Sequence, residues 1–421
     1  MNLTSKKAHR KLSLTHYIFI GISLGMLAGW LFGETILPFA DPLANVFLRL
    51  LRMIIMPLIV FSILSGVLSI GTGKSLGSLG LKTFLYYIIS SMLAIFTGQI
   101  LVNIFRPGVG AELGLQKEVE QIATADQDFM DFLFRIIPEN PFQSLAAGDV
   151  LPVIFFSILL GYFITRLKSQ QRTTLTDVID GAFEAMMKLT HMIIWSAPLG
   201  VFGINARIVA TTGFDAFKSL GFYFAVVLLG LAIHAFFNLP MLLRLVARVD
   251  PIKHYRGMFP ALLTAFSTSS SMVTLPVNID CVTRNSRVSK KVAGFLLPIG
   301  ATVNMDGTAL YESVAAIFIA QVYGIHLGFG QQLIVVVTAL LASIGAAGVP
   351  MAGLVMLSVI LHAVGLPLEG VGIILAVDRV LDMFRTTVNI LSDSCGAVIV
   401  ARLEGETLEG MGTAIEEDSR D

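Results

Sequence analysis

The stretch "NMDGT", residues 304–308, interrupts an apolar run that extends from about Val292 to Val322. Gly307 and its short polar neighbours predict a local break in a helix, which would expose backbone carbonyls and place Asp306 among apolar side chains. Hard cations prefer carbonyl and carboxylate oxygens as ligands. A helix kink stabilised by Asn304 is the alternative. The rest of the chain decides whether this break lies in water or in hydrocarbon.

The composition is that of an integral membrane protein. Of the 421 residues, 55% are hydrophobic and 14% are charged, and the mean hydropathy is +0.79, whereas about 25% of a soluble domain is charged. We therefore expect a multi-pass protein in the lipid bilayer of a plasma membrane or a bacterial inner membrane. The net charge is zero and the basic residues form no single patch, which gives no support for nucleic-acid binding. Cys281 and Cys395 indicate buried side chains rather than a disulfide framework or a zinc site.

Apolar segments predict eight spans, since a bilayer crossing needs roughly 20 residues. They lie near residues 15–35, 42–70, 78–106, 148–168, 173–203, 214–247, 291–324 and 369–403. A cleaved signal peptide is the alternative for the first, but no convincing cleavage site follows it. Within it, "GISLG" (21–25) matches a hydrolase pattern, which we interpret as a chance match because no strand precedes it. We expect no enzyme and no catalytic residue.

Two further apolar stretches, 255–285 and 330–366, are interrupted at their centres by "STSSSMVTLP" and "SIGAAGVPMAG". Basic residues flank the first on both sides and the second on neither side, and Lys and Arg accumulate in cytoplasmic loops. We therefore predict two re-entrant hairpins that enter from opposite faces, with tips that meet near the midplane. Ordinary spans interrupted by Gly and Pro are the alternative.

The alternation of basic loops also orients the chain. It places both termini in the cytoplasm and the long polar stretch 108–140 outside. Residues 405–421 are expected to form a disordered cytoplasmic tail.

The last predicted span carries a polar stripe. At about 100° per residue, one helix face holds Asp378, Asp382, Arg385, Thr386, Asn389 and Asp393, whereas Arg379 points elsewhere. Four ionised groups at a helix centre would cost roughly 10 kcal/mol at about 2.5 kcal/mol each, so they must face a polar cavity and pair there. A buried ion-pair network that only locks helices together is the alternative.

The stripe offers more partners than such a lock needs, because it combines cationic, anionic, amide and hydroxyl groups. Arg385 could bind a carboxylate through two parallel hydrogen bonds. Asp382 could accept from an ammonium, and Asn389 with Thr386 could fix orientation. This set suits both ends of a zwitterionic ligand, and secondary transporters place such sites at broken helices near the midplane.

Taken together, "STSSSMVTLP", "GATVNMDGTALYE", "SIGAAGVPMAG" and "DMFRTTVNILSD" resemble the dicarboxylate/amino acid:cation symporter family, the glutamate transporters and their archaeal and bacterial homologues. The resemblance covers almost the whole chain. It implies an all-α membrane fold of eight transmembrane helices and two re-entrant hairpins, built from inverted repeats and assembled as a homotrimer. A scaffold (1–77 and 108–210) would hold a transport unit (78–107 and 211–404) that slides like an elevator.

The resemblance also implies site residues. The substrate would contact Ser269, Ser271, Thr308, Val349, Gly353, Asp382, Arg385, Thr386 and Asn389. Arg385 would hold its side-chain carboxylate and Asp382 its amino group. One sodium ion would bind Gly300, Asn304, Asn389 and Asp393; a second Thr302, Ser343, Ile344 and Ala346; and a third Tyr87, Ser90, Ser91, Asn304 and Asp306. Glu312 matches a proton-carrying glutamate of mammalian-type relatives, which leaves proton coupling open.

The expected function is therefore sodium-coupled symport of a small acidic amino acid, with up to three sodium ions. A proton-coupled glutamate or C4-dicarboxylate carrier, a neutral amino acid exchanger and an anion channel are the alternatives. Retention of Asp382 favours an amino acid over a plain dicarboxylate, and Asp393 favours sodium over protons. A second arginine, which the family often places at positions 269 or 383, is replaced here by Ser269 and Met383.

Overall fold

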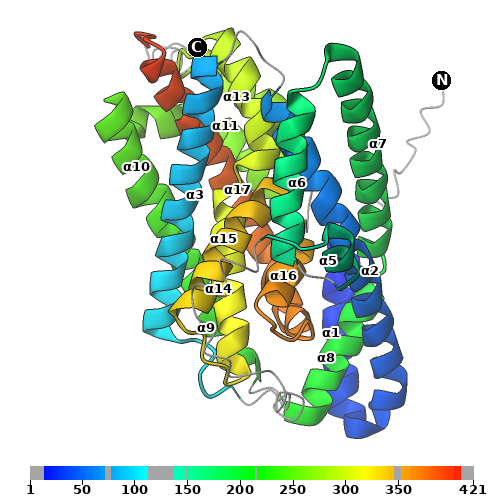
Figure 1. The fold of residues 1–421 in the computed structure, drawn as a ribbon. Coiled ribbons are helices and arrows are strands. Elements are labelled where there is room, and N and C mark those ends of the chain that lie inside the picture. Colours follow the sequence, from blue (N-terminus) through cyan, green and yellow to red (C-terminus); the bar gives the residue numbers. More distant parts are fainter. Residues whose placement is uncertain are drawn as a thin grey trace, which may run out of the picture.

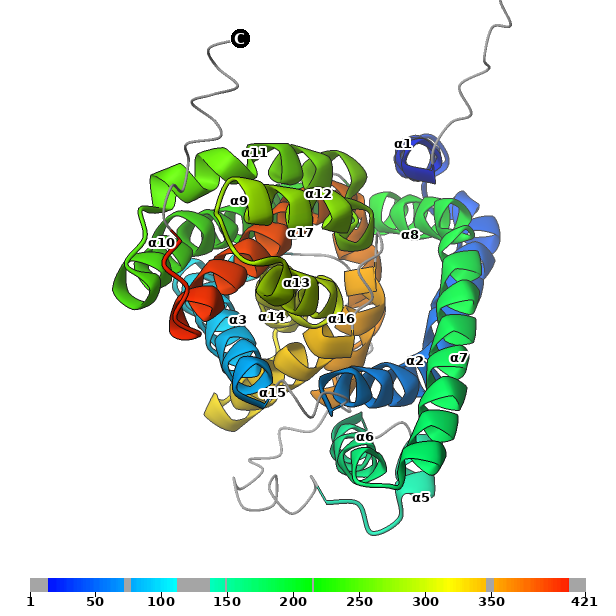
Figure 2. The same cartoon turned by 90° about the horizontal axis from the view of Figure 1, so that it is seen from above.

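The structure, a computed structural model, describes residues 14–71, 77–111, 137–147, 150–213, 216–345 and 352–408. Every regular element in that part is helical (Figure 1). Seen from above, the helices form two groups (Figure 2). One consists of α1 (Leu14–Phe32), α2 (Leu37–Gly71), α5 (Pro141–Ala147), α6 (Val150–Thr165), α7 (Ser169–Ile194) and α8 (Ala197–Thr212). The other contains α3 (Gly77–Phe105) and the helices from α9 onward.

Three of the described helices are long and apolar enough to cross a membrane by length and composition: Tyr17–Phe47, Ser78–Phe105 and Ser219–Ala247. The first of these joins α1 to α2 through the short 3-10 turn η1 (Gly33–Ile36). Shorter apolar helices accompany them. The predicted span 369–403 corresponds closely to α17 (Gly370–Leu403), one unbroken helix.

Two predicted spans are less regular than expected, and a proline accompanies each departure. The span predicted at 173–203 is divided into α7 and α8, because Pro198 at the start of α8 has no N–H to continue the helical ladder. The span predicted at 214–247 holds α9 (Ala216–Ile233), a π-helical turn η3 (His234–Asn238), α10 (Leu239–Leu242) and a second π-helical turn η4 (Leu243–Ala247). Pro240 is the second residue after the first π turn.

The "STSSSMVTLP" interruption is a break between two packed helices, α11 (Pro251–Thr268) and α12 (Ser271–Arg284). Ser269 has a left-handed backbone (φ 50°), and the Ser270 side chain accepts a hydrogen bond from the Val273 N–H. At the opposite end, Asn285 Nδ2 donates to the Gly257 carbonyl at 2.7 Å. The two helices are therefore antiparallel. Entry and exit on one membrane face stay a prediction.

The second interrupted stretch gives α15 (Phe329–Gly345) and α16 (Ala352–Ala363), which pack on each other. Residues 346–351 at their junction lie outside the described residues. The predicted break at "NMDGT" is confirmed: α13 (Lys290–Val303) ends before Asn304, and α14 (Asp306–Val322) begins after Met305. Nearly all of α14 is buried.

The pattern at 21–25 has a structural role. Gly21, Gly25 and Gly29 follow one face of α1 and lie against the backbone of α8. A Cβ atom at these positions would be 2.4, 2.5 and 2.4 Å from the carbonyl oxygens of Pro198, Phe202 and Ala206. Glycines spaced by four residues therefore let the two helix backbones approach closely, as in membrane helix pairs of the G-x-x-x-G type.

Candidate functional site

The polar face of α17 is buried as the helical angles predict. Asp378, Asp382, Arg385, Thr386, Asn389 and Asp393 are all at most 6% exposed. Arg385 is central: its Nη2 donates to Asp382 Oδ1 at 2.8 Å, and its Nη1 lies 3.1 Å from Asp378 Oδ1. The guanidinium carbon also lies 3.8 Å from the ring centroid of Tyr311 on α14. A buried cation is thus held by two carboxylates and an aromatic face.

This guanidinium retains capacity for another partner. Among the described residues, Arg385 Nε has no hydrogen-bonded partner, and Nη1 is held by the ion pair to Asp378 alone. Gly353 on α16 also lies close to this guanidinium. A Cβ there would be 3.0 Å from Arg385 Nη1 and 3.3 Å from Thr308 Cγ2. Gly353 and Thr308, two of the predicted substrate contacts, therefore lie beside Arg385.

The expectation for Arg379 is wrong. Its Nη1 donates to Asp382 Oδ2 at 3.2 Å, and its side chain is only 13% exposed. A long side chain three residues earlier on a helix can reach the same neighbour although its Cβ points aside. Asp382 is therefore shared by two guanidinium groups.

Asn389 connects α17 to the start of α14. Its Oδ1 accepts from the Gly307 N–H at 2.8 Å, and its Nδ2 donates to Thr308 Oγ1 at 3.2 Å. A Cβ on Gly307 would be 2.6 Å from the Arg385 carbonyl oxygen, so glycine is required for this approach. Thr386 is buried nearby at 5% exposed.

The break between α11 and α12 lies beside α17. Phe266 and Phe384, the neighbour of Arg385, have ring centroids 5.1 Å apart in an edge-to-face arrangement. Ser269 and Ser271 are buried, and Ser269 Oγ has no partner among the described residues. Val349 lies outside the described residues.

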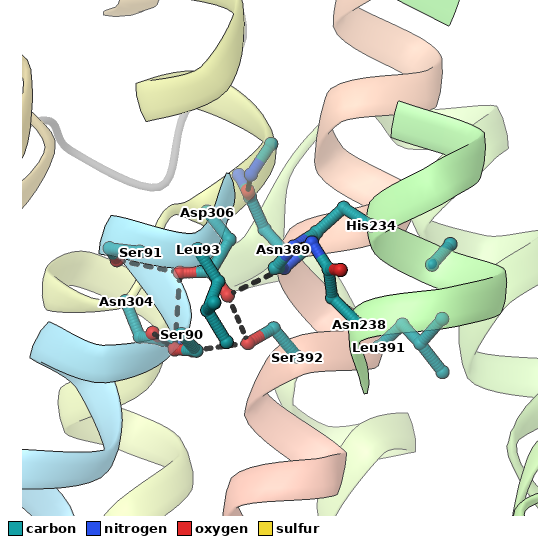
Figure 3. A network of polar contacts seen from close by, with 12 residues as sticks. Ser90, Ser91, Leu93, His234, Asn238, Asn304, Asp306, Asn389, Leu391 and Ser392 are labelled. Atoms are coloured by element: carbon teal, nitrogen blue, oxygen red, sulfur yellow. Dashed lines mark hydrogen bonds and ion pairs between the residues drawn. The ribbon is translucent and has the colours of Figure 1, made fainter. Parts of the chain in front are cut away.

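A second polar cluster surrounds Asp306 (Figure 3). Ser91 Oγ donates to Asp306 Oδ1 at 2.6 Å, and Ser90 Oγ lies 3.3 Å from Asp306 Oδ1, Asn304 Oδ1 and the Tyr87 carbonyl oxygen. The five residues predicted for the third sodium ion are therefore in one place. The Tyr87 hydroxyl instead donates to the Leu296 carbonyl at 2.8 Å.

The residues predicted for the first sodium ion are adjacent. Asn304 Nδ2 donates to Asp393 Oδ1 at 2.9 Å. A Cβ on Gly300 would be 2.5 Å from the same Asp393 oxygen, so glycine lets that carboxylate approach α13. Asp393 Oδ2 is buried without a hydrogen-bonded partner among the described residues. Asn389 bonds one turn away, at Gly307 and Thr308.

The set predicted for the second sodium ion is only partly described. The hydroxyls of Thr302 and Ser343 donate within their own helices, to the carbonyls of Ile299 at 3.1 Å and Leu340 at 2.8 Å. Ile344 lies in the last turn of α15, where only its backbone is described, and Ala346 is outside the described residues. Glu312 on α14 is fully buried, and neither carboxyl oxygen has a hydrogen-bonded partner among the described residues.

Several residues at the two clusters were not predicted from the sequence: Tyr311, His234, Asn238 and Ser392. His234 Nε2 lies 3.0 Å from Asp306 Oδ2, and Ser392 Oγ donates to the same oxygen at 2.6 Å. Ser392 follows the stripe of α17 and its spacing could have been noticed. A histidine in the apolar run that continues from α9 into η3 carries no such pattern.

The donor set suits an alkali cation. No group of three or more His, Cys, Asp or Glu side chains able to hold a metal occurs among the described residues. Hydroxyl, amide, carbonyl and carboxylate oxygens converge instead around Asp306 and Asp393. Oxygen ligands of this kind fit hard cations and not the N/S chemistry of zinc.

An all-helical membrane protein with a buried charged site between broken helices belongs to the class of secondary transporters by its architecture. The profile of the "Sodium:dicarboxylate symporter family" matches residues 14–403, and the chain belongs to this family. It is 36% identical to "Excitatory amino acid transporter 3" of Homo sapiens, over 90% of this chain and 82% of that protein. It is 34% identical to "Proton/sodium-glutamate symport protein" of Geobacillus stearothermophilus, over 96% and 97% of the respective chains.

Proposed function

We propose that the protein is a sodium-coupled symporter of acidic amino acids. The observation that carries this proposal is the buried Arg385, which is shared by Asp378 and Asp382 and whose Nε has no hydrogen-bonded partner among the described residues. A carboxylate suits that guanidinium and an ammonium suits Asp382. The names of the relatives agree, since they are excitatory amino acid and glutamate transporters.

Binding would proceed by exchange of partners. Arg385 and Asp382 are bonded to each other at 2.8 Å, so a substrate carboxylate would take Arg385 while the substrate ammonium takes the vacated Asp382 Oδ1. Arg379 would keep its hydrogen bond to Asp382 Oδ2. The pair is therefore a place-holder for a zwitterion, and this argues against a permanent lock.

The charge balance favours coupling to cations. Five carboxyl groups are buried at 6% exposure or less, Asp306, Glu312, Asp378, Asp382 and Asp393, against the guanidinium groups of Arg385 and Arg379. Full ionisation would leave three uncompensated negative charges, and an acidic amino acid adds a fourth. Uncompensated buried ions cost several kcal/mol each. Three sodium ions and one proton would neutralise the loaded site.

The residues around Asp306 and Asp393 would hold two of these ions through oxygen ligands. Glu312 would carry the proton, because a carboxyl group without a hydrogen-bonded partner is least costly when neutral. The sodium-coupled symporter would therefore also move one proton with each amino acid.

The two groups of helices suggest how the site would move. The group with α1, α2 and α5 to α8 would be the scaffold of a homotrimer, and α3 with α9 to α17 would slide against it as an elevator. The boundaries proposed for these units are 1–77, 78–107, 108–210 and 211–404.

Uptake of labelled aspartate and glutamate into proteoliposomes would test the function. A carrier accumulates the amino acid above equilibrium when sodium is higher outside, whereas an anion channel does not. Replacement of sodium by choline at constant ionic strength should abolish accumulation. Uptake driven only by a pH gradient would favour the proton-coupled glutamate carrier, and competition by succinate or alanine would favour the dicarboxylate or neutral amino acid alternatives.

A further inference from the structure

His234 faces Asp306, the first residue of α14 (Figure 3). It is fully buried, and its Nε2 is 3.0 Å from Asp306 Oδ2. It is the first residue of the π-helical turn η3, and Asn238 is the last. The Leu239 N–H donates to the His234 carbonyl, which closes this wider turn. Such π turns occur often at functional sites.

The neighbouring hydrogen bonds assign the proton of the imidazole. The Thr97 hydroxyl donates to the Leu93 carbonyl at 2.7 Å, so Thr97 Oγ1 is an acceptor for Asn238 Nδ2 at 2.9 Å. The same Asn238 Nδ2 lies 3.2 Å from His234 Nδ1. An amide nitrogen only donates, so Nδ1 accepts and the ring proton of a neutral imidazole lies on Nε2. His234 is therefore a hydrogen-bond donor to Asp306.

The two oxygens of Asp306 consequently have different surroundings. Oδ2 receives His234 Nε2 and the Ser392 hydroxyl, at 3.0 and 2.6 Å. Within the described part of the chain, Oδ1 receives the hydroxyls of Ser90 and Ser91 and no other donor. A hydroxyl can rotate and present a lone pair to a cation, whereas an imidazole N–H whose tautomer is fixed cannot. Oδ1 is thus the oxygen that is available to an ion.

We propose that His234 is a positioning residue for the cation site at Asp306. The relay from Thr97 through Asn238 makes it a fixed donor, which holds Oδ2 and directs Oδ1 toward Ser90, Ser91 and Asn304. His234 does not itself contact the cation. The proposal rests on the proposed function in one respect, since it takes sodium as the cation.

Two matched substitutions test the role. His234→Gln keeps an N–H donor at about the reach of Nε2, whereas His234→Asn is too short to reach Asp306. The measured quantity is the sodium concentration that half-saturates purified full-length protein. It is determined by a sodium-binding titration without amino acid. We expect His234→Asn to raise it about ten- to a hundredfold, which is the range for a lost hydrogen bond to a charged group. His234→Gln should stay within about threefold of the wild type.

A histidine outside this cluster serves as the control. His254 is equally buried, but it bonds Ser286 Oγ at 2.8 Å and Ser394 Oγ at 3.0 Å and does not contact Asp306. His254→Asn should leave the half-saturating sodium concentration unchanged. Equal effects of His234→Gln and His234→Asn, or an unchanged sodium titration in a folded His234→Asn, would overturn the proposal.

A spectroscopic measurement covers the case in which His234→Asn does not fold. Nitrogen-15 NMR of histidine-labelled protein, assigned with His234→Gln, distinguishes a proton on Nε2 from one on Nδ1. The proposal requires it on Nε2, and a proton on Nδ1 would overturn it. If the wild type binds sodium but transports no amino acid, the proposed function is wrong and the role of His234 is unaffected. If the wild type transports acidic amino acids with sodium but the two His234 variants behave alike, the role of His234 is wrong and the proposed function is unaffected.

Discussion

Arg385 illustrates how a charged side chain is retained at depth. It is stacked on Tyr311 at 3.8 Å and paired with Asp382 and Asp378. Removing one partner of a buried ion pair is costly because the other charge remains. A lysine could not replace this arginine, because a guanidinium group offers two parallel donors to a carboxylate and an ammonium group does not.

Arg385→Cys should lower the affinity for acidic amino acids by at least about a hundredfold. The reason is that a charge-assisted contact with two parallel hydrogen bonds is lost. Neutral amino acids should then bind instead, and binding titrations of aspartate, glutamate and serine measure the change. Arg402→Cys, at the exposed end of the same helix, is the control. Unchanged aspartate affinity would contradict the assigned role.

Asp306→Asn should raise the half-saturating sodium concentration at least tenfold, because the carboxylate charge at the oxygen cluster is removed. The measurement is sodium-dependent aspartate uptake in proteoliposomes. Asp280→Asn, on the exposed side of α12, should behave like the wild type. A sodium titration that does not shift would show that the cation binds elsewhere.

For single residues, the sequence predicted which helix face a side chain occupies better than it predicted which residue the side chain contacts. The 100° rule placed the face of α17 correctly because a straight helix keeps its angles over many residues. It failed for Arg379 because a long side chain can return to a neighbouring carboxylate. His234 could not be predicted, since its function depends on a contact with α14, 72 residues away in the chain.

At the scale of helices, prolines and glycines decided what could be predicted. The break at "NMDGT" and the hairpin interruption at Ser269 were predicted because short polar and glycine residues disrupt apolar helices. The break between α7 and α8 and the π turns before Pro240 and before Arg248 were missed, because hydropathy does not report the hydrogen-bond ladder. Prolines at 42 and 57 lie inside α2, so a proline alone does not predict a break.

Gly25→Val should destabilise the pairing of α1 with α8, because the added side chain would meet the Phe202 carbonyl at 2.5 Å. Overpacking of this kind typically costs about 1–3 kcal/mol. The midpoint of thermal unfolding in detergent measures it. Leu24→Val, on the exposed face of α1 (51% exposed), is the matched control. Equal midpoints for both variants would rule out the close glycine contact.

The ends of α3 and α17 are tied by Glu404, whose pKa is held below its usual range by hydrogen bonds from Lys82 Nζ (2.7 Å) and Ser78 Oγ (2.9 Å). A lowered pKa in the folded state means that this contact stabilises the protein above the ordinary carboxyl pKa of about 4.3 and is lost as the pH falls through the lowered value. Glu404→Gln should therefore be less stable than the wild type at pH 7 and equally stable at low pH. Thermal unfolding across pH measures this, and a difference that grows below pH 4 would have the wrong sign.

At the scale of the whole molecule, charge balance matters: among the described residues, buried carboxyl groups outnumber buried guanidinium groups. The folded state should therefore bind sodium more strongly than the unfolded chain does. Replacing choline by sodium at constant ionic strength should raise the midpoint of thermal unfolding, and aspartate should raise it further. A ligand at a hundred times its dissociation constant stabilises by about 2.7 kcal/mol. An identical midpoint in both salts would contradict the charge argument.

The contact between Gly307 and the Arg385 carbonyl has a consequence for the molecule as a whole. Asp306 immediately precedes Gly307, and Asn389 bridges Gly307 to the helix that carries Arg385. The oxygen cluster around Asp306 and the backbone of the helix that carries Arg385 thus meet at Gly307. If bound sodium raises the affinity for the amino acid by some factor, the bound amino acid must raise the affinity for sodium by the same factor, because equilibrium coupling is reciprocal.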